Sequence, residues 1–127
     1  MSADTPLGQA IIEPVQIGIG ESAHYKLEQL CVDGYFAEMR DGYRFAVSYA
    51  LLIGANPERM EGARKTVFSI STIDPEGLLK LAIETLHPID GEASYKVAER
   101  LADWGVSEID RLFREEFKTV GDLLPSE

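Results

Sequence analysis

The first regular pattern along the chain is an alternation of apolar with small or polar residues from Val15 to Ile19. A period of two residues predicts a short strand, with its odd-numbered residues, Val15 included, on one face. Ser22 follows, and a serine hydroxyl can cap the free amides of a first helical turn. Apolar residues then recur at helical spacing up to Cys31, so we predict a short helix that ends at Asp33–Gly34.

A second helix is predicted from about Ala37 to Ile53, with Gly54 as its end. Phe45 and Tyr49 lie one turn apart and off its main apolar stripe, so this helix has two apolar faces. Such a helix is central to a core or is shared with a second subunit. We favour the core, and the alternative of a dimer interface would use four aromatic residues: Phe36, Tyr43, Phe45 and Tyr49.

After a polar loop that starts at Asn56, residues 66–71 are rich in β-branched and aromatic side chains and predict a second strand. Asp74 followed by Pro75 is typical of a helix start, because an aspartate caps the first turn and proline suits the first helical position. The apolar stripe that follows predicts a helix that ends at Pro88.

The last part of the chain predicts two further helices, one from Ala93 that is closed by Gly105 and one from Ser107 to Phe117. Residues 1–14 show no sustained period and predict a flexible N-terminus. The fold class is therefore α+β and mainly helical, with about five helices and two short strands in a single domain over residues 15–127.

Length and composition agree with one ordinary globular domain, since the chain has 127 residues and is 45% hydrophobic. Its single cysteine, Cys31, excludes an internal disulfide framework and a cysteine-rich zinc site, and fits a reducing cytoplasm. The chain has neither an export signal nor an apolar run long enough to span a bilayer. We therefore expect a cytoplasmic protein without a membrane partner.

The net charge of −10 is unevenly distributed. Residues 1–39 carry −5 and residues 66–127 carry −7, whereas residues 40–65 carry +2. This balance argues against a general polyanion binder, because binding to phosphates needs concentrated Lys and Arg. Anion contacts, if any, are local to the basic middle of the chain, at Arg40, Arg44, Arg59, Arg64 and Lys65.

Candidate catalytic groups are few. His24 and His87 are far apart in sequence and fit no metal-ligand spacing. Gly18-Ile19-Gly20-Glu21-Ser22-Ala23 has the spacing of a dinucleotide-binding loop, but a second helix follows where that fold needs a strand. We expect no enzymatic activity, no cofactor and no metal, an expectation that a pocket joining His24 or His87 to paired carboxylates would change.

The order of strand, helix, Gly34-Tyr35 turn and helix from Val15 to Leu52 resembles ribbon-helix-helix repressors of the Arc and MetJ type. In that family two strands pair across a dimer and their outward side chains contact bases in the major groove. The resemblance implies Gln16 as the base-contacting residue, although no Lys or Arg precedes Lys26 to bind phosphates.

Three later segments are similar to a family of small proteins associated with bacterial DNA phosphorothioation and phage defence. The segments are FAEMRDGYRFAVSYALLIG (36–54), TIDPEGLLKLAIE (72–84) and YKVAERLADWGVSEIDRLF (95–113). The chain departs from that family in its thinner basic loop, with Arg59, Arg64 and Lys65 only. The resemblance implies a cellular context and not a chemistry.

These observations predict a non-enzymatic accessory protein that acts by protein association, as a homodimer or with another protein, in a bacterial defence or DNA-modification system. The alternative is a DNA-binding regulator of the ribbon-helix-helix type that uses Gln16, Arg40, Arg44 and the loop from Arg59 to Lys65.

Overall fold

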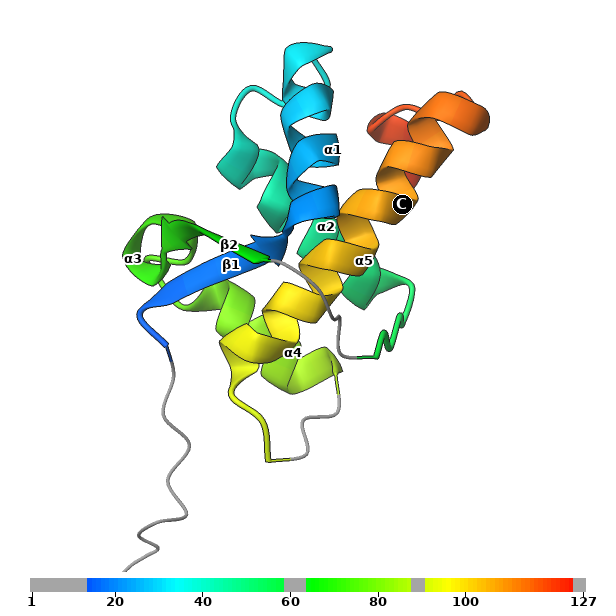
Figure 1. The fold of residues 1–127 in the computed structure, drawn as a ribbon. Helices are drawn as coiled ribbons and strands as arrows, with labels where there is room; N and C mark the ends of the chain where they lie inside the picture. Colours follow the sequence, from blue (N-terminus) through cyan, green and yellow to red (C-terminus); the bar gives the residue numbers. More distant parts are fainter. Residues whose placement is uncertain (1–13, 59–63, 88–90, 125–127) are drawn as a thin grey trace, which may run out of the picture.

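The computed structural model describes residues 14–58, 64–87 and 91–124 (Figure 1). Its elements, in chain order, are β1 (Gln16–Gly20), α1 (Glu21–Val32), α2 (Met39–Leu52), β2 (Arg64–Ser69), α3 (Ile70–Ile73), α4 (Leu78–Leu86), α5 (Ser94–Glu115) and the 3-10 helix η2 (Gly121–Leu123). The predicted α+β, mainly helical fold in one compact domain is confirmed. Arg59 and the predicted flexible segment, except Pro14, lie outside the described residues.

The helix α5 crosses the molecule and packs against α1, α2, α4 and β1 (Figure 1). The prediction of two helices separated at Gly105 is wrong, because α5 is continuous from Ser94 to Glu115. Gly105 faces α2, where a Cβ atom would lie 2.4 Å from the carbonyl oxygen of Ala46. The glycine therefore permits a close approach of two helices and does not end one. Two predicted helices are thus one helix, and the short helix α3 was not predicted. The described residues therefore still contain five α-helices.

The two strands pair antiparallel, from Gln16 opposite Ser69 to Gly20 opposite Arg64, with an irregularity between Ile17 and Gly18. Both strands were predicted, but β1 begins one residue later and β2 two residues earlier than the pattern indicated. Ile17 and Ile19 are fully buried, as expected for one face of the strand. Val15 precedes the strand and is 80% exposed, so its predicted place on the buried face is wrong.

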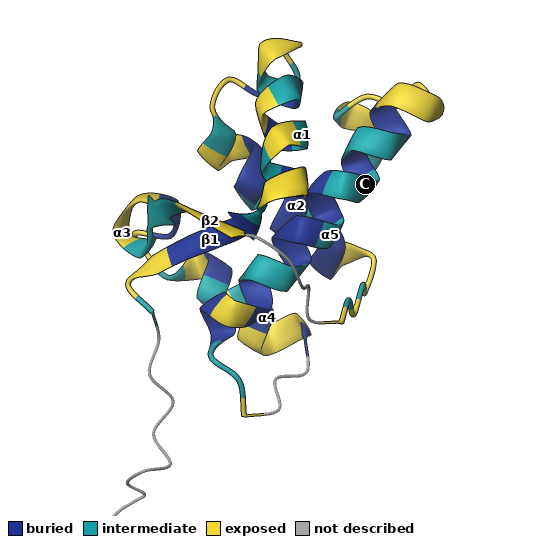
Figure 2. Cartoon of the chain, in the orientation of Figure 1, coloured by how far each residue is buried: buried dark blue, intermediate teal, exposed yellow. Residues whose placement is uncertain are grey.

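The core lies where α2, α5 and β1 meet (Figure 2). Tyr43 of α2 is fully buried there, and its hydroxyl donates a hydrogen bond of 2.8 Å to the carbonyl oxygen of Gly18. Phe36 is also buried and packs against Phe45 and Phe113, with ring centroids 5.4 and 6.5 Å away. The structure thus places Phe36 and Tyr43, two of the four candidate dimer residues, in the core of one chain.

The predicted helix caps differ in position from those observed. Ser22 lies inside α1, which begins at Glu21 with Gly20 as its N-cap. The helix α4 begins at Leu78 and not at Pro75, after Gly77 in a left-handed conformation. Asp74 nevertheless caps α4, because its carboxylate accepts hydrogen bonds from the backbone amides of the second and third helical residues, at 2.9 and 3.0 Å.

Replacing Gly105 with alanine should destabilise the protein. Alanine favours a helix by about 1 kcal/mol over glycine, but overpacking against the Ala46 backbone costs about 1–3 kcal/mol. We expect a net loss of up to about 2 kcal/mol in the free energy of unfolding, measured by urea denaturation. The control is Gly121→Ala, where the nearest atom to the new Cβ is 3.7 Å away and a change within about 0.5 kcal/mol is expected. A more stable Gly105→Ala protein would contradict the close contact.

Candidate functional site

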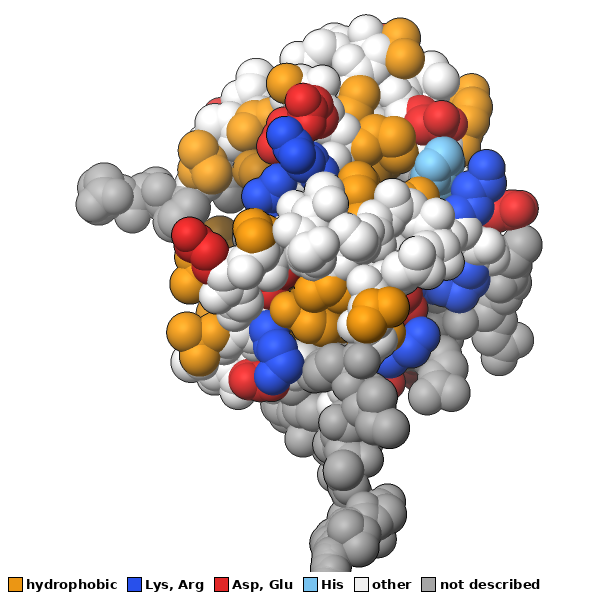
Figure 3. All heavy atoms as spheres, turned by 90° about the vertical axis from the view of Figure 1, so that its left-hand side faces the viewer, with side chains coloured by type: hydrophobic (Ala, Val, Ile, Leu, Met, Phe, Trp, Pro, Cys, Tyr) orange, Lys and Arg blue, Asp and Glu red, His pale blue; other side chains and the backbone are white. Residues whose placement is uncertain are grey.

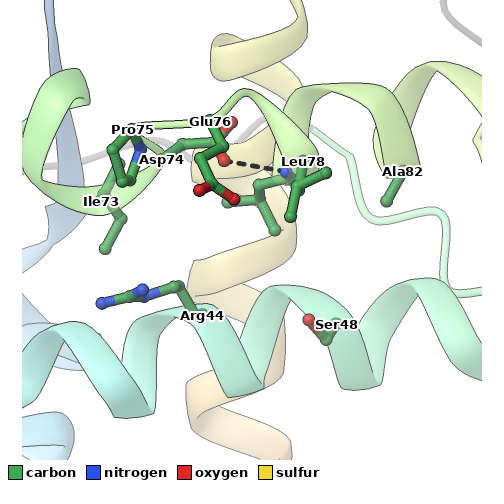
Figure 4. Close-up of a pocket in the computed structure, with 9 residues that line it drawn as sticks. Arg44, Ser48, Ile73, Asp74, Pro75, Glu76, Leu78 and Ala82 are labelled. Atoms are coloured by element: carbon green, nitrogen blue, oxygen red, sulfur yellow. Dashed lines mark hydrogen bonds between the residues drawn. The ribbon is translucent and has the colours of Figure 1, made fainter.

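A cavity of about 300 Å³ lies between α2 and the turn that joins α3 to α4 (Figure 4). Its polar residues are Arg44 and Ser48 of α2 together with Asp74 and Glu76 of the turn. The remaining walls are apolar: Ile73, Pro75, Leu78, Leu79 and Ala82. Arg44, one of the predicted anion contacts, is thus brought into a concave site of a size that small ligands occupy.

Two opposite charges lie on opposite sides of this cavity (Figure 4). The guanidinium of Arg44 makes only a 3.4 Å contact with the carbonyl oxygen of Arg40 and has no carboxylate partner among the described residues. Glu76 is exposed and likewise forms no ion pair within the described part of the chain. Asp74, in contrast, is buried and accepts three hydrogen bonds, from the amides of Leu79 and Lys80 and from the Tyr95 hydroxyl.

A second cavity, of about 230 Å³, lies on the other side of Ser48 and is almost wholly apolar. Its lining residues are Phe45, Ser48, Tyr49, Leu52, Leu123 and Leu124. Phe45 and Tyr49, the other two candidate dimer residues, are partly buried, and the Tyr49 ring lies parallel to Trp104 with centroids 6.5 Å apart. We call the cavity with Arg44 the polar cavity and this one the apolar cavity.

Large apolar side chains remain exposed around both cavities. Leu52 at the apolar cavity is 53% exposed, and Leu78 at the rim of the polar cavity is 62% exposed. Leu124, which also lines the apolar cavity, is 54% exposed. Exposed apolar clusters of this kind on a small domain indicate a surface that contacts another molecule.

The glycine motif with dinucleotide spacing is occupied by the chain itself. The amide of Gly18 donates to a carboxylate oxygen of Glu99, and the amide of Gly20 donates to one of Asp103, each at 2.7 Å. Arg64 binds the other oxygen of Asp103 at 2.8 Å. Asp103 is fully buried, and its carboxylate and that of Glu99 help to raise the pKa of the buried Tyr43 hydroxyl, for which desolvation is the main cause. The motif therefore binds an anion, but an internal one.

The described residues proposed as DNA contacts lie in two places, with Arg40 and Arg44 one turn apart on α2 and the others on the two strands. Arg64 is engaged by Asp103, while Gln16 lies at the other end of the two-stranded sheet. Arg40 pairs with Glu38 at 2.7 Å, and Lys65 is exposed on β2. On the face shown in Figure 3, Lys and Arg side chains lie apart from one another and beside acidic ones.

The ribbon-helix-helix arrangement stays a prediction, with a constraint from the strand. One edge of β1 pairs with β2 of the same chain, and two amides on its other edge bind Glu99 and Asp103. A ribbon shared between two chains would have to displace these bonds.

The histidines and the cysteine do not form a catalytic group in the described part of the chain. The His24 ring lies 3.6 Å from the Glu28 carboxylate on the same helix, and Cys31 is partly exposed on α1. His87 is buried beside a cavity of about 210 Å³ that has no carboxylate among its described lining residues. No group of three or more His, Cys, Asp or Glu side chains among the described residues is placed to hold a metal ion.

Sequence reasoning identified Arg44, Phe45 and Tyr49 but missed Ser48 and Glu76. Ser48 lies one helical turn after Arg44, so a helical projection of α2 could have placed the two side by side. Nothing in the local sequence connects Glu76 with α2, because the chain brings them together only through packing of α4.

Comparisons with protein-family models, with curated proteins and with solved structures found no match for this chain. Among the described residues, no helix combines the length and the hydropathy that crossing a bilayer requires. The two cavities and the exposed apolar residues at their rims are therefore the features from which a function can be inferred.

Replacing Asp103 with asparagine should destabilise the fold. The amide keeps the shape but removes the charge that Arg64 and the Gly20 amide bind, and breaking one side of a buried pair is costly. We expect a loss of about 2–3 kcal/mol in the free energy of unfolding, measured by urea denaturation. Asp110→Asn on the same helix is the control: its carboxylate binds Arg114 at the surface, so a loss below about 1 kcal/mol is expected. Equal losses would show that burial of Asp103 has no special role.

Stability should depend on pH through His87. Its pKa is lowered from 6.5, mainly because burial disfavours the charged ring and further because Arg100 is near, although Glu92 opposes this. As the pH falls below about 6.5, the histidine of the unfolded chain takes up a proton before that of the folded chain does. The free energy of unfolding therefore decreases with falling pH, and this decrease stops once the pH is below the pKa of His87 in the folded protein.

His87→Gln and His87→Phe should both flatten the fall in the free energy of unfolding between about pH 7 and pH 5. The two variants share the loss of titration and differ in packing, so a common effect is due to the proton. Wild-type and variant curves that run parallel over this range would contradict the assignment.

Proposed function

We propose that this protein is a non-enzymatic association protein that works as a homodimer through the apolar cavity of α2. The observation that carries the proposal is the group of half-buried aromatic and exposed leucine side chains at Phe45, Tyr49, Leu52 and Leu124. Aromatic residues that are partly buried and surrounded by aliphatic ones are typical of the centres of protein interfaces.

The lack of charged side chains among the described residues at the apolar cavity favours a second copy of the chain as its partner. Two chains of net charge −10 repel each other wherever their carboxylates face one another. The described residues that line the apolar cavity include no charged side chain, so two copies can meet there without bringing carboxylates together. A symmetric dimer uses the same surface twice, which requires only that this one patch fit itself.

An accessory role in a bacterial defence or DNA-modification system is the wider proposal, supported by the resemblance of residues 36–113 to small proteins of that context. We place this role in the cytoplasm, in agreement with the single cysteine. Deletion of the gene and return of either wild-type protein or a monomeric variant, followed by phage plating and analysis of DNA modification, tests it. Unchanged plating and unchanged DNA modification after deletion would contradict it.

Replacing Leu52 with glutamate should weaken the dimer. A carboxylate in the apolar cavity would have to lose water and would face its own copy across a symmetric interface. We expect the dimer dissociation constant, measured by sedimentation velocity, to rise at least about tenfold.

The control is Val32→Glu on α1, which adds the same charge at a 76% exposed apolar position outside the cavity and should leave the dimer intact. Circular dichroism and thermal unfolding of both variants exclude a loss of fold. A wild-type protein that is monomeric up to about 0.1 mM, or equal effects of both variants, would overturn the homodimer.

A further inference from the structure

We propose that the polar cavity binds a small zwitterion with an apolar body, as in a free neutral α-amino acid such as leucine. The inference does not rest on the homodimer, because the polar and apolar cavities lie on different sides of Ser48 and share only that residue. Three features carry it: a cation that has no carboxylate partner among the described residues, an anion on the opposite wall that has no ion pair among them, and apolar lining residues.

The carboxylate of the ligand is bound by Arg44. Its guanidinium offers several N–H donors in one plane, and its only described contact is the weak 3.4 Å one to the backbone of its own helix. The Ser48 hydroxyl lies one turn further along α2, lines the same cavity and makes no described hydrogen bond. Figure 4 shows the Arg44 guanidinium directed away from Ser48, so the charge that binds the carboxylate comes from Arg44.

The ammonium group of the ligand is bound by Glu76. This residue lies in the turn between α3 and α4, on the opposite wall from Arg44 (Figure 4). The neighbouring carboxylate of Asp74 accepts hydrogen bonds from two backbone amides and the Tyr95 hydroxyl, so its oxygens already have donors within the protein. Glu76 is left as the acceptor on this side.

The floor accepts the apolar body of the ligand. Ile73 and Leu79 are buried and line the cavity, with Ile73 close to both Arg44 and Glu76 and Ala82 farther along α4 (Figure 4). The cavity volume of about 300 Å³ corresponds to roughly ten water molecules, and therefore to a ligand of about ten non-hydrogen atoms.

The pairing of charges decides the class of ligand. A simple anion would be attracted by Arg44 but repelled by Glu76. A simple cation would be attracted by Glu76 but repelled by Arg44. A zwitterion satisfies both walls at once, and a ligand that lacks either charge leaves one wall unpaired. Selectivity for the zwitterion over its singly charged analogues therefore follows from the geometry.

Titration of ¹⁵N-labelled full-length protein with L-leucine, followed by NMR, tests the proposal. We expect shifts of the amide signals around Arg44–Ser48 and residues 74–82, with saturation in the millimolar range. N-acetyl-L-leucine, which lacks the ammonium, and L-leucinamide, which lacks the carboxylate, should each bind at least about tenfold more weakly.

Two variants separate the walls. Arg44→Gln should weaken binding of leucine and N-acetyl-leucine at least about tenfold but should not weaken leucinamide, whose cation Arg44 repels. Glu76→Gln should weaken leucine and leucinamide but should not weaken N-acetyl-leucine, whose anion Glu76 repels. Arg40→Gln, one turn earlier on α2, and the exposed Glu115→Gln are matched controls that should change nothing.

Absence of shifts at millimolar leucine, or equal affinity for all three compounds, would overturn the proposal. Repeating the titration on Leu52→Glu distinguishes this result from the homodimer, because leucine should bind that variant as it binds the wild type. Loss of leucine binding in Leu52→Glu, whose side chain lines only the apolar cavity, would also count against a separate polar site.

Discussion

The close contact between Ala46 of α2 and Gly105 of α5 determines which residues this molecule presents to its surroundings. A Cβ atom on Gly105 would lie 2.4 Å from the Ala46 carbonyl oxygen. The backbones of α2 and α5 are therefore too close at this point to admit any side chain larger than that of glycine. Arg44 and Ser48 are each two residues from Ala46, about 200° around the helix, and so point away from α5. Both cavities of α2 therefore depend on this one contact.

Local periodicity predicted most of the fold because local spacing decides which face of an element is apolar. The strand at Ile17 and the helices around Tyr43 and Ile83 follow from their own residues. Gly105 could not be interpreted in this way, since glycine both ends helices and allows close packing, and only the presence of α2 selects between the two. Asp74 was correctly identified as a cap, but the helix α4 begins at Leu78, four residues after it, and not at Pro75. The way the turn packs sets this spacing.

The sites were less predictable than the fold because they join residues far apart in sequence. Arg44 was found from charge, and Phe45 and Tyr49 from a helix with two apolar faces, yet Glu76 reaches the cavity only through the position of α4. The glycine motif is instructive in the same way. Its amides do bind carboxylates, but these are supplied by Glu99 and Asp103, at separations of 81 and 83 residues.

Those separations have a consequence for the order in which the chain can assemble during synthesis. The strand β1 precedes its partners along the chain, because its sheet partner is residues 64–69 and its remaining amide partners lie on α5. The helices α1 and α2 can form from neighbouring residues while the chain is still being translated. One edge of β1 is completed only when β2 has emerged, and the other only when Asp103 has emerged. The strand β1 is thus translated before the other described elements, and α5 is what completes it.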